Sequence, residues 1–179
     1  NNPDSNFTHY HHWLVPLSLT ITLGTIAYQT EELIFVAYMS LYSLFSIIGH
    51  LDYFKNQKIR NNGYLILGAL GTISILFVLS YDWYWEQLRT KNISIHQILG
   101  SVEFIASLII SIIALGLLYI EKRNKTMRDI NPFEITFILF ILLFILGFVS
   151  YLSVLLINIL ILIIGVFTIR NGSKMGHLG

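Results

Sequence analysis

The sequence of 179 residues contains no cysteine. Disulfide bonds, thiolate metal sites and cysteine nucleophiles are therefore excluded. Charged residues are also scarce: they make up 12% of the chain, whereas a soluble domain carries about 25%. Because hydrophobic residues account for 55%, too little polar surface remains to cover a soluble core. The composition indicates a membrane protein.

Several motifs that carry chemistry are missing as well. The sequence has no phosphate-binding loop, no HExxH zinc motif, no dinucleotide fingerprint and no Ser/His/Asp arrangement. Its formal net charge is +1, and no basic stripe alternates with aromatic residues, so a nucleic-acid partner is not predicted. We therefore predict no cofactor and no catalytic residue, and we favour a non-enzymatic role.

Long apolar runs are what the sequence does have. Residues 98–120 carry one charge, Glu103, and about 20 apolar residues in a helix cross a bilayer core. Ser94 followed by Gln97 is a capping box that predicts the start of this helix. The whole pattern predicts an all-α, polytopic transmembrane bundle of one domain, with six spans in three hairpins. The spans are expected at about 13–29, 33–51, 63–81, 94–120, 132–148 and 152–169.

The last two spans come from one apolar run. Glu134 is the only charge within residues 133–169. A single helix of that length would measure roughly 55 Å, against a bilayer core of about 30 Å. We therefore expect the chain to reverse within residues 147–153. Asn131 and Pro132 predict the start of the fifth span, because asparagine caps helices and proline suits the first helical position.

Basic residues are distributed unevenly between the two sides of this predicted bundle. Nine of the eleven lysines and arginines fall on one side, which should be cytoplasmic, so both chain ends are predicted to be cytoplasmic. We interpret the basic run 122–128 as topology-setting charge, with binding of anionic lipid headgroups as the alternative. The nine are Lys55, Lys58, Arg60, Lys122, Arg123, Lys125, Arg128, Arg170 and Lys174, and the other two are Arg89 and Lys91.

Aromatic residues follow the third span. Tyr81, Trp83 and Trp85 lie within five residues of one another. Tyrosine and tryptophan are enriched where a membrane meets water. These three residues are predicted to form an aromatic belt at the membrane interface.

One ionisable residue, Glu103, falls near the outer end of the fourth span and needs a partner or a function there. Ser107 shares its helical face, and His96 lies on nearly the same side. Asn158 falls near the middle of the sixth span. These four residues form a candidate intramembrane polar site. It could bind a proton, a cation or a polar substrate, but interhelical hydrogen bonding is the favoured interpretation.

Histidines gather on the predicted cytoplasmic side. His11, His12 and His50 are the candidate ligands for a metal ion or a haem, because imidazole is a common ligand of both. None of them forms an i, i+4 pair on a clear helix, so solvated polar surface is the favoured interpretation.

The chain resembles a known group of proteins in its six short spans, in the aromatic phrase at residues 81–83 and in the phrase Ile-Arg-Asn-Gly-Ser-Lys at residues 169–174. These features resemble bacterial multi-pass membrane proteins of the domain-of-unknown-function 2157 type. The resemblance implies a helical bundle in the bacterial inner membrane, and it implies no activity, cofactor or catalytic residue. In that family a glycine-rich phrase like residues 172–179 tends to lead into a further span. Because the chain also begins with asparagine, we interpret it as part of a longer protein.

Three functional hypotheses follow. The leading one is a non-enzymatic subunit or partner-binding component of a membrane assembly, in contact with the lipid bilayer and with another membrane protein or a second copy. The alternative is a small-solute or ion- or proton-coupled transporter that uses Glu103. The third is an intramembrane metal or haem protein, which would need His50 and a second histidine within coordinating reach.

Overall fold

The computed structural model describes residues 6–25, 33–51, 54, 61–90, 95–123, 131–149 and 152–174, and every regular element in these ranges is a helix. The predicted all-α class is confirmed. The helices are α1 (Asn6–Thr25), α2 (Ile34–Gly49), α3 (Gly63–Leu79), α4 (Asp82–Thr90), α5 (Ile95–Gly100), α6 (Val102–Lys122), α7 (Pro132–Val149) and α8 (Ser153–Lys174).

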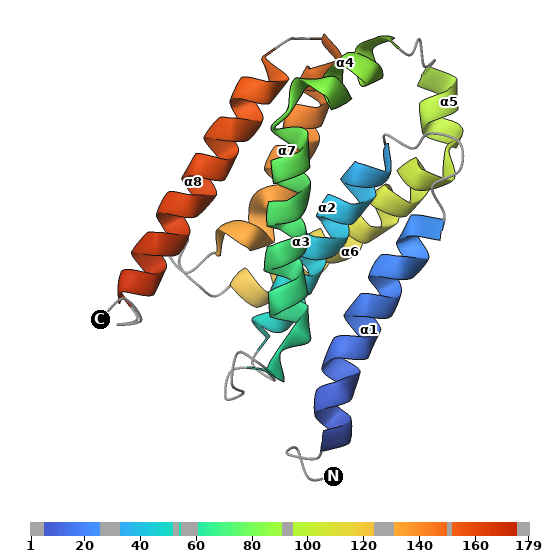
Figure 1. Cartoon of the computed structure of the whole chain (residues 1–179). Coiled ribbons are helices and arrows are strands. Elements are labelled where there is room, and N and C mark those ends of the chain that lie inside the picture. The colour runs from blue at the N-terminus through green and yellow to red at the C-terminus, as the bar shows by residue number, and fades with distance from the viewer. Residues whose placement is uncertain are drawn as a thin grey trace.

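The short helix α2 is the centre of the bundle. It packs against α3, α6 and α7, while α1 and α8 form the two flanks (Figure 1). The approach between α2 and α3 is close, because a Cβ added at Gly68 would lie 2.8 Å from the carbonyl oxygen of Tyr42. Small residues permit such close packing between helices in lipid.

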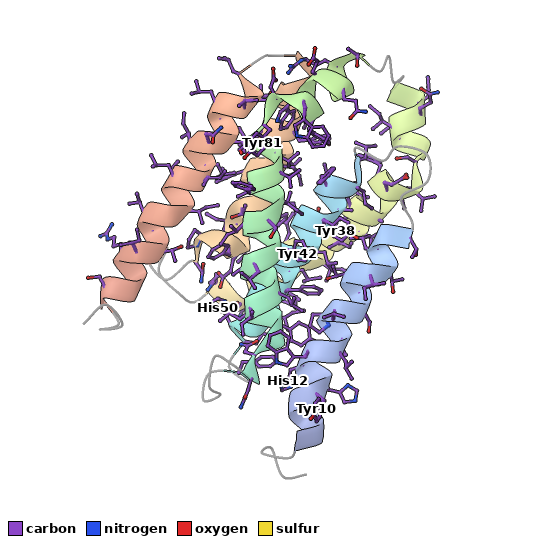
Figure 2. The ribbon with its side chains drawn as sticks, viewed as in Figure 1. Tyr10, His12, Tyr38, Tyr42, His50 and Tyr81 are labelled. Atoms are coloured by element: carbon purple, nitrogen blue, oxygen red, sulfur yellow. The ribbon has the colours of Figure 1, made fainter. Side chains whose placement is uncertain are left out.

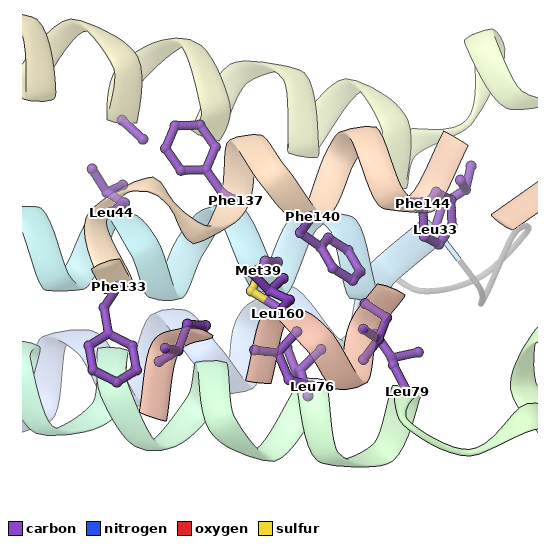
Figure 3. Close-up of a cluster of buried hydrophobic side chains, with 14 of the residues drawn as sticks. Leu33, Met39, Leu44, Leu76, Leu79, Phe133, Phe137, Phe140, Phe144 and Leu160 are labelled. Atoms are coloured by element: carbon purple, nitrogen blue, oxygen red, sulfur yellow. The ribbon is translucent and has the colours of Figure 1, made fainter. Parts of the chain in front are cut away.

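The main hydrophobic core lies where α2, α3, α7 and α8 meet (Figure 3). Aromatic residues of α7 fill it: Phe137 and Phe140 are 1% and 0% exposed. Met39 of α2, which is fully buried, packs in the same cluster. A second, smaller cluster joins α1 to α2 around Phe45.

The division of the last apolar run is confirmed. The single run separates into α7 and α8, which pack against each other, and the break falls between Val149 and Ser153. Figure 1 shows the two helices running in opposite directions. Each helix is therefore much shorter than one continuous helix over residues 133–169 would be.

The fourth predicted span is interrupted, contrary to the prediction of one helix over residues 94–120. The chain breaks at Ser101, whose side-chain oxygen accepts a hydrogen bond from the backbone N–H of Phe104 at 3.2 Å and caps α6. The short helix α5 precedes the break. Glu103 consequently lies in the first turn of α6 and not inside a longer helix. Ser94 lies outside the described residues.

Helix α1 begins at Asn6, earlier than the predicted start near residue 13, so Pro16 lies well inside the helix. Proline has no N–H to donate to the carbonyl group four residues before it. That carbonyl belongs to His12, and a Cβ added at Gly63 would meet its oxygen. Gly63, at the start of α3, thus permits α1 to pack closely at the turn where Pro16 removes a backbone hydrogen bond of α1.

Among the described residues, two helices are long and apolar enough to cross a membrane: Val102–Lys122 and the first 18 residues of α8, Ser153–Arg170. Within each, only 22% of the apolar 18-residue window is buried. The apolar stretches Ile34–Gly49, Gly63–Leu79 and Pro132–Gly147 are shorter. The described chain is therefore a helical protein with two candidate membrane-spanning helices.

Candidate functional site: an ion-pair cluster at one end of the bundle

The start of α7 is built by a reciprocal cap. The side-chain oxygen of Asn131 accepts from the backbone N–H of Phe133 at 3.1 Å, and a carboxylate oxygen of Glu134 accepts from the backbone N–H of Asn131 at 3.4 Å. This arrangement satisfies two otherwise unpaired donors, as a capping box does. The sequence pattern predicted this helix start correctly, but it noted Glu134 only as the one charge in an apolar run.

The carboxylate of Glu134 is fully buried and lies at the centre of a charged cluster. Lys122, in the last turn of α6, places its Nζ 3.0 Å from one carboxylate oxygen and 3.3 Å from the other. The same Nζ lies 3.3 Å from a carboxylate oxygen of Glu121. Both charges of the central pair suit their helix ends, since an N-terminus favours an anion and a C-terminus a cation. A buried carboxylate needs such partners to remain ionised.

His50 completes the cluster from the end of α2. Its Nδ1 lies 2.7 Å from the carbonyl oxygen of Ser46 and 3.3 Å from a carboxylate oxygen of Glu134, and its Nε2 lies 3.1 Å from Nδ2 of Asn131. Because the Asn131 side-chain oxygen accepts from Phe133, the Asn131 amide nitrogen faces His50 as a donor. Nε2 must then accept. Lys122 is the cation nearest to the Glu134 carboxylate, and His50 joins the cluster through both of its ring nitrogens.

A stripe of buried hydroxyl groups leads along α2 to this cluster. Ser40, Ser43 and Ser46 are each 0% exposed. Ser40 shares a 2.8 Å hydrogen bond with Ser111 of α6, whereas the Oγ atoms of Ser43 and Ser46 make no hydrogen bond within the described part of the chain. Buried hydroxyl groups without partners are costly in an apolar medium. Their placement gives the interior of the bundle a polar line beside its aromatic core.

Glu103, the residue that the sequence singled out, is buried at the other end of α6. It is 1% exposed, and Ser107 on the same face is 5% exposed. The hydroxyl group of Ser107 donates to the carbonyl oxygen of Phe104 at 2.9 Å. The face with Glu103, Ser107 and Ser111 therefore points into the bundle.

The other two residues of the predicted intramembrane site lie elsewhere. His96 is exposed on α5, beyond the break at Ser101, so it does not continue the buried face of Glu103. Asn158 is exposed on α8, where its Nδ2 donates to the carbonyl oxygens of Val154 at 2.8 Å and Ser80 at 3.4 Å. Asn158 thus links α8 to the end of α3. The structure does not bring the four predicted residues into one site.

The three candidate metal-binding histidines also lie in different environments. His11 is exposed, and His12 is 8% exposed, with its ring centroid 4.7 Å from that of Phe54. His50 belongs to the Glu134 cluster. Figure 2 shows His12 and His50 toward the same end of the bundle. Among the described residues, no group of three histidine or carboxylate side chains is arranged to hold a metal ion.

The predicted aromatic belt is wrong for Trp85. Tyr81 and Trp83 are 51% and 55% exposed, but Trp85 is 0% exposed. Residues 82–90 form helix α4, so neighbouring aromatic residues of this segment face either solvent-accessible surface or the core. The Trp85 indole N–H donates to the carbonyl oxygen of Leu79 at 2.8 Å, and its ring lies against Gly147 of α7. Trp85 is therefore a core residue that packs α4 on α7.

A signal for the Glu134 cluster was present in the predicted topology. In any up-and-down arrangement of these helices, the end of α2, the end of α6 and the start of α7 meet on one side. His50, Lys122 and Glu134 occupy those three positions. Grouping the ionisable residues at these helix ends would have identified the cluster.

Comparisons of the chain with protein-family models, with curated proteins and with solved structures find no match.

Proposed function

We propose that this chain is an integral protein of the bacterial inner membrane, with six spans in three hairpins and both ends cytoplasmic, and that it is a non-enzymatic, partner-binding component of a membrane assembly. The observation that supports membrane embedding is the low burial of the apolar helices α6 and α8. A core helix of a soluble protein is mostly buried, yet only 22% of each apolar window is buried here. The resemblance to the domain-of-unknown-function 2157 type agrees with this proposal and assigns no residue a role.

The exposed side chains support membrane embedding. Large aliphatic residues that are more than 40% exposed occur on several helices, and α1, α6 and α8 carry most of them. Such surface is stable in lipid but not in water. On α1 they are Leu14, Leu17, Leu19 and Ile21; on α6, Val102, Ile105, Leu108, Ile109, Ile112, Ile113, Leu115 and Ile120; and on α8, Leu155, Ile159, Leu162, Ile163, Val166 and Ile169.

The short helices fit a bilayer with some adjustment. Helix α2 has 16 residues and α3 has 17, which corresponds to about 24 to 26 Å of rise, whereas an average bilayer core is about 30 Å thick. Local thinning of the bilayer and anchoring by interfacial side chains compensate for such a mismatch. The exposed Tyr81 and Trp83 lie where such anchors are needed.

The outward face of α6 is the proposed partner surface. A Cβ added at Gly116 would meet nothing within 4 Å, so this glycine leaves a notch on an otherwise bulky face. Ile112 and Ile120, one turn away on either side, are 60% and 70% exposed. A glycine in such a position lets a second helix approach closely.

The proposal is tested by expressing the full chain and measuring the mass of the complex that mild detergent extracts from the membrane. We expect the chain to require detergent and to migrate with a further membrane protein or with a second copy. Gly116→Leu should reduce that complex to the mass of a single chain. Gly165→Leu is the matched control, because a Cβ there also meets nothing within 4 Å. Extraction without detergent, or a wild-type chain that is always single, would contradict the proposal.

A second candidate function, transport of a proton or small cation, is favoured by one observation. Glu103 and Glu134 are both buried, near opposite ends of the bundle, and the hydroxyl stripe of α2 lies between them. Ionisable groups inside membrane bundles often lie on ion pathways. Purified chain in liposomes with a pH-sensitive dye inside should then show a flux that Glu103→Gln and Glu134→Gln each abolish. A flux equal to that of empty liposomes would remove this candidate.

A further inference from the structure

Helix α8 is held to the bundle by a single narrow stripe. Its buried residues are Ser153, Ile157, Leu160 and Ile164, which recur every three to four positions and so share one face. This face packs against α7 and α3. Val154 and Ile161 are partly buried against the core, and most of the other aliphatic side chains of α8 point outward. An apolar groove lies on each side of the stripe near Ile164.

The two grooves are separated by Ile164, which lines both. The groove on the α7 side has a volume of about 240 Å³ and is lined mainly by Ile135, Leu139, Ile163 and Phe167. The groove on the α3 side has a volume of about 350 Å³ and includes Ile161, Gly165 and Thr168.

In the part of the chain that the structure describes, only the groove on the α7 side is followed along α8 by a basic residue. Ile163 and Phe167 lie on one line of α8, and the next positions on that line reach Arg170, which is exposed. On the other side of α8, the line of residues that borders the α3-side groove continues to Gly172, which carries no charge. This line runs through Ile161, Gly165 and Thr168. From Leu160 to Arg170 the helix rises about 15 Å, which is half of a bilayer core.

We propose that the groove between α7 and α8 binds one acyl chain of an anionic phospholipid of the leaflet at the Arg170 end, with its headgroup phosphate on the Arg170 guanidinium. This inference rests on the proposed membrane embedding. The groove supplies an apolar slot whose α8 wall runs from Leu160 to Phe167, about 10 Å along the helix, and ends one turn before Arg170. A guanidinium forms charge-assisted hydrogen bonds with phosphate oxygens. Because lipid chains are already in hydrocarbon, the preference between lipids comes from the headgroup, and one basic residue gives a preference of about five-fold.

Native mass spectrometry of the full chain in detergent micelles tests the site, with phosphatidylglycerol or phosphatidylcholine of identical acyl chains as the probe. We expect the wild type to retain phosphatidylglycerol about five-fold better, and Arg170→Gln to reduce that ratio to about one. Ile163→Trp, which fills the groove, should lower retention of both lipids. Leu162→Trp is the matched control: Leu162 is 67% exposed and belongs to neither groove, so retention should stay at the wild-type level.

Three outcomes would overturn the site: equal retention of the two lipids by the wild type, a preference that Arg170→Gln leaves unchanged, or wild-type retention by Ile163→Trp. A mass of two chains that Ile163→Trp reduces to one would assign the groove to a second copy and would also overturn it. A chain that stays soluble without detergent contradicts the membrane proposal itself. A chain that needs detergent but shows no lipid preference contradicts only the lipid site.

Discussion

Glu103 and Glu134 both lie in the first turn of a helix, and both are buried, at 1% and 0% exposure. They occupy different environments. Glu134 lies where three helix ends meet, with Lys122 and His50 within ion-pair distance. Glu103 begins the face of α6 that carries Ser107 and Ser111. Two carboxylates with the same helical position and the same burial therefore differ in what the neighbouring helices bring to them, and at Glu134 two other helix ends bring Lys122 and His50.

The strongest prediction concerns removal of the carboxylate at the centre of the cluster. Glu134→Ala leaves Lys122 without its closest partner in a site where its side chain is 12% exposed. Breaking one side of a buried pair costs about 3–5 kcal/mol. Unfolding in a detergent titration should show a loss of this size, and Glu86→Gln, at an exposed position, should change the free energy of unfolding little.

The paired substitution sharpens this test. Glu134→Leu combined with Lys122→Leu removes both charges together, and such replacements of buried ion pairs are often neutral. The double variant should therefore be clearly more stable than Glu134→Ala. If the double variant is as unstable as the single one, the loss comes from the cap of α7 and not from the ion pair.

The next largest effect is expected at Asn131. Asn131→Ala removes the cap of Phe133 and the contact with Nε2 of His50. Loss of an asparagine cap costs about 0.5–2 kcal/mol. The free energy of unfolding should fall by an amount in this range, and Asn131→Ser, which can still cap, should recover part of it. No loss in Asn131→Ala would mean that the cluster does not depend on this cap.

A smaller effect is expected for Glu103→Gln. An amide still forms hydrogen bonds in place of a carboxyl group, so the free energy of unfolding should change by about 1 kcal/mol or less. The same detergent titration measures it beside Glu134→Gln. A loss at Glu103 that equals or exceeds the loss at Glu134 would reverse the contrast between the two residues.

The smallest effect belongs to the hydrogen bond between Ser40 and Ser111. Interhelical hydrogen bonds in membrane proteins contribute on average about 0.6 kcal/mol. Ser111→Ala should cost roughly this much, and in a double-mutant cycle with Ser40→Ala the coupling should account for most of it. A coupling of zero would show that the 2.8 Å contact does not stabilise the packing of α2 on α6.

Local signals in the sequence predicted much of the fold. The cap at Asn131 and the excess length of residues 133–169 gave the start of α7 and the break before α8, because both follow from backbone chemistry and helix rise. The break at Ser101 was missed because the apolar composition continues across it. Trp85 was misplaced because composition alone does not reveal that residues 82–90 form a helix with one buried face.

The candidate site was less accessible from the sequence. Glu103 was correctly singled out as a residue inside an apolar run, but the groups around Glu134 come from three separate helix ends. No local pattern encodes their proximity, and the available signal was the predicted topology, which places these three helix ends on one side. His50 was considered as a metal or haem ligand, with solvated polar surface as the favoured interpretation. Its contacts with Ser46, Asn131 and Glu134 instead make it a member of a hydrogen-bonded cluster.

We propose a membrane bundle whose Glu134 end faces the cytoplasm, and thiol labelling in intact cells tests this orientation. The chain has no cysteine, so one introduced residue is the only target. Gln87 and Ser173 are both exposed and belong to opposite ends of the proposed topology. A membrane-impermeant reagent should label Gln87→Cys in intact cells and Ser173→Cys only after lysis. Labelling of Ser173→Cys in intact cells, with or without labelling of Gln87→Cys, would contradict the account.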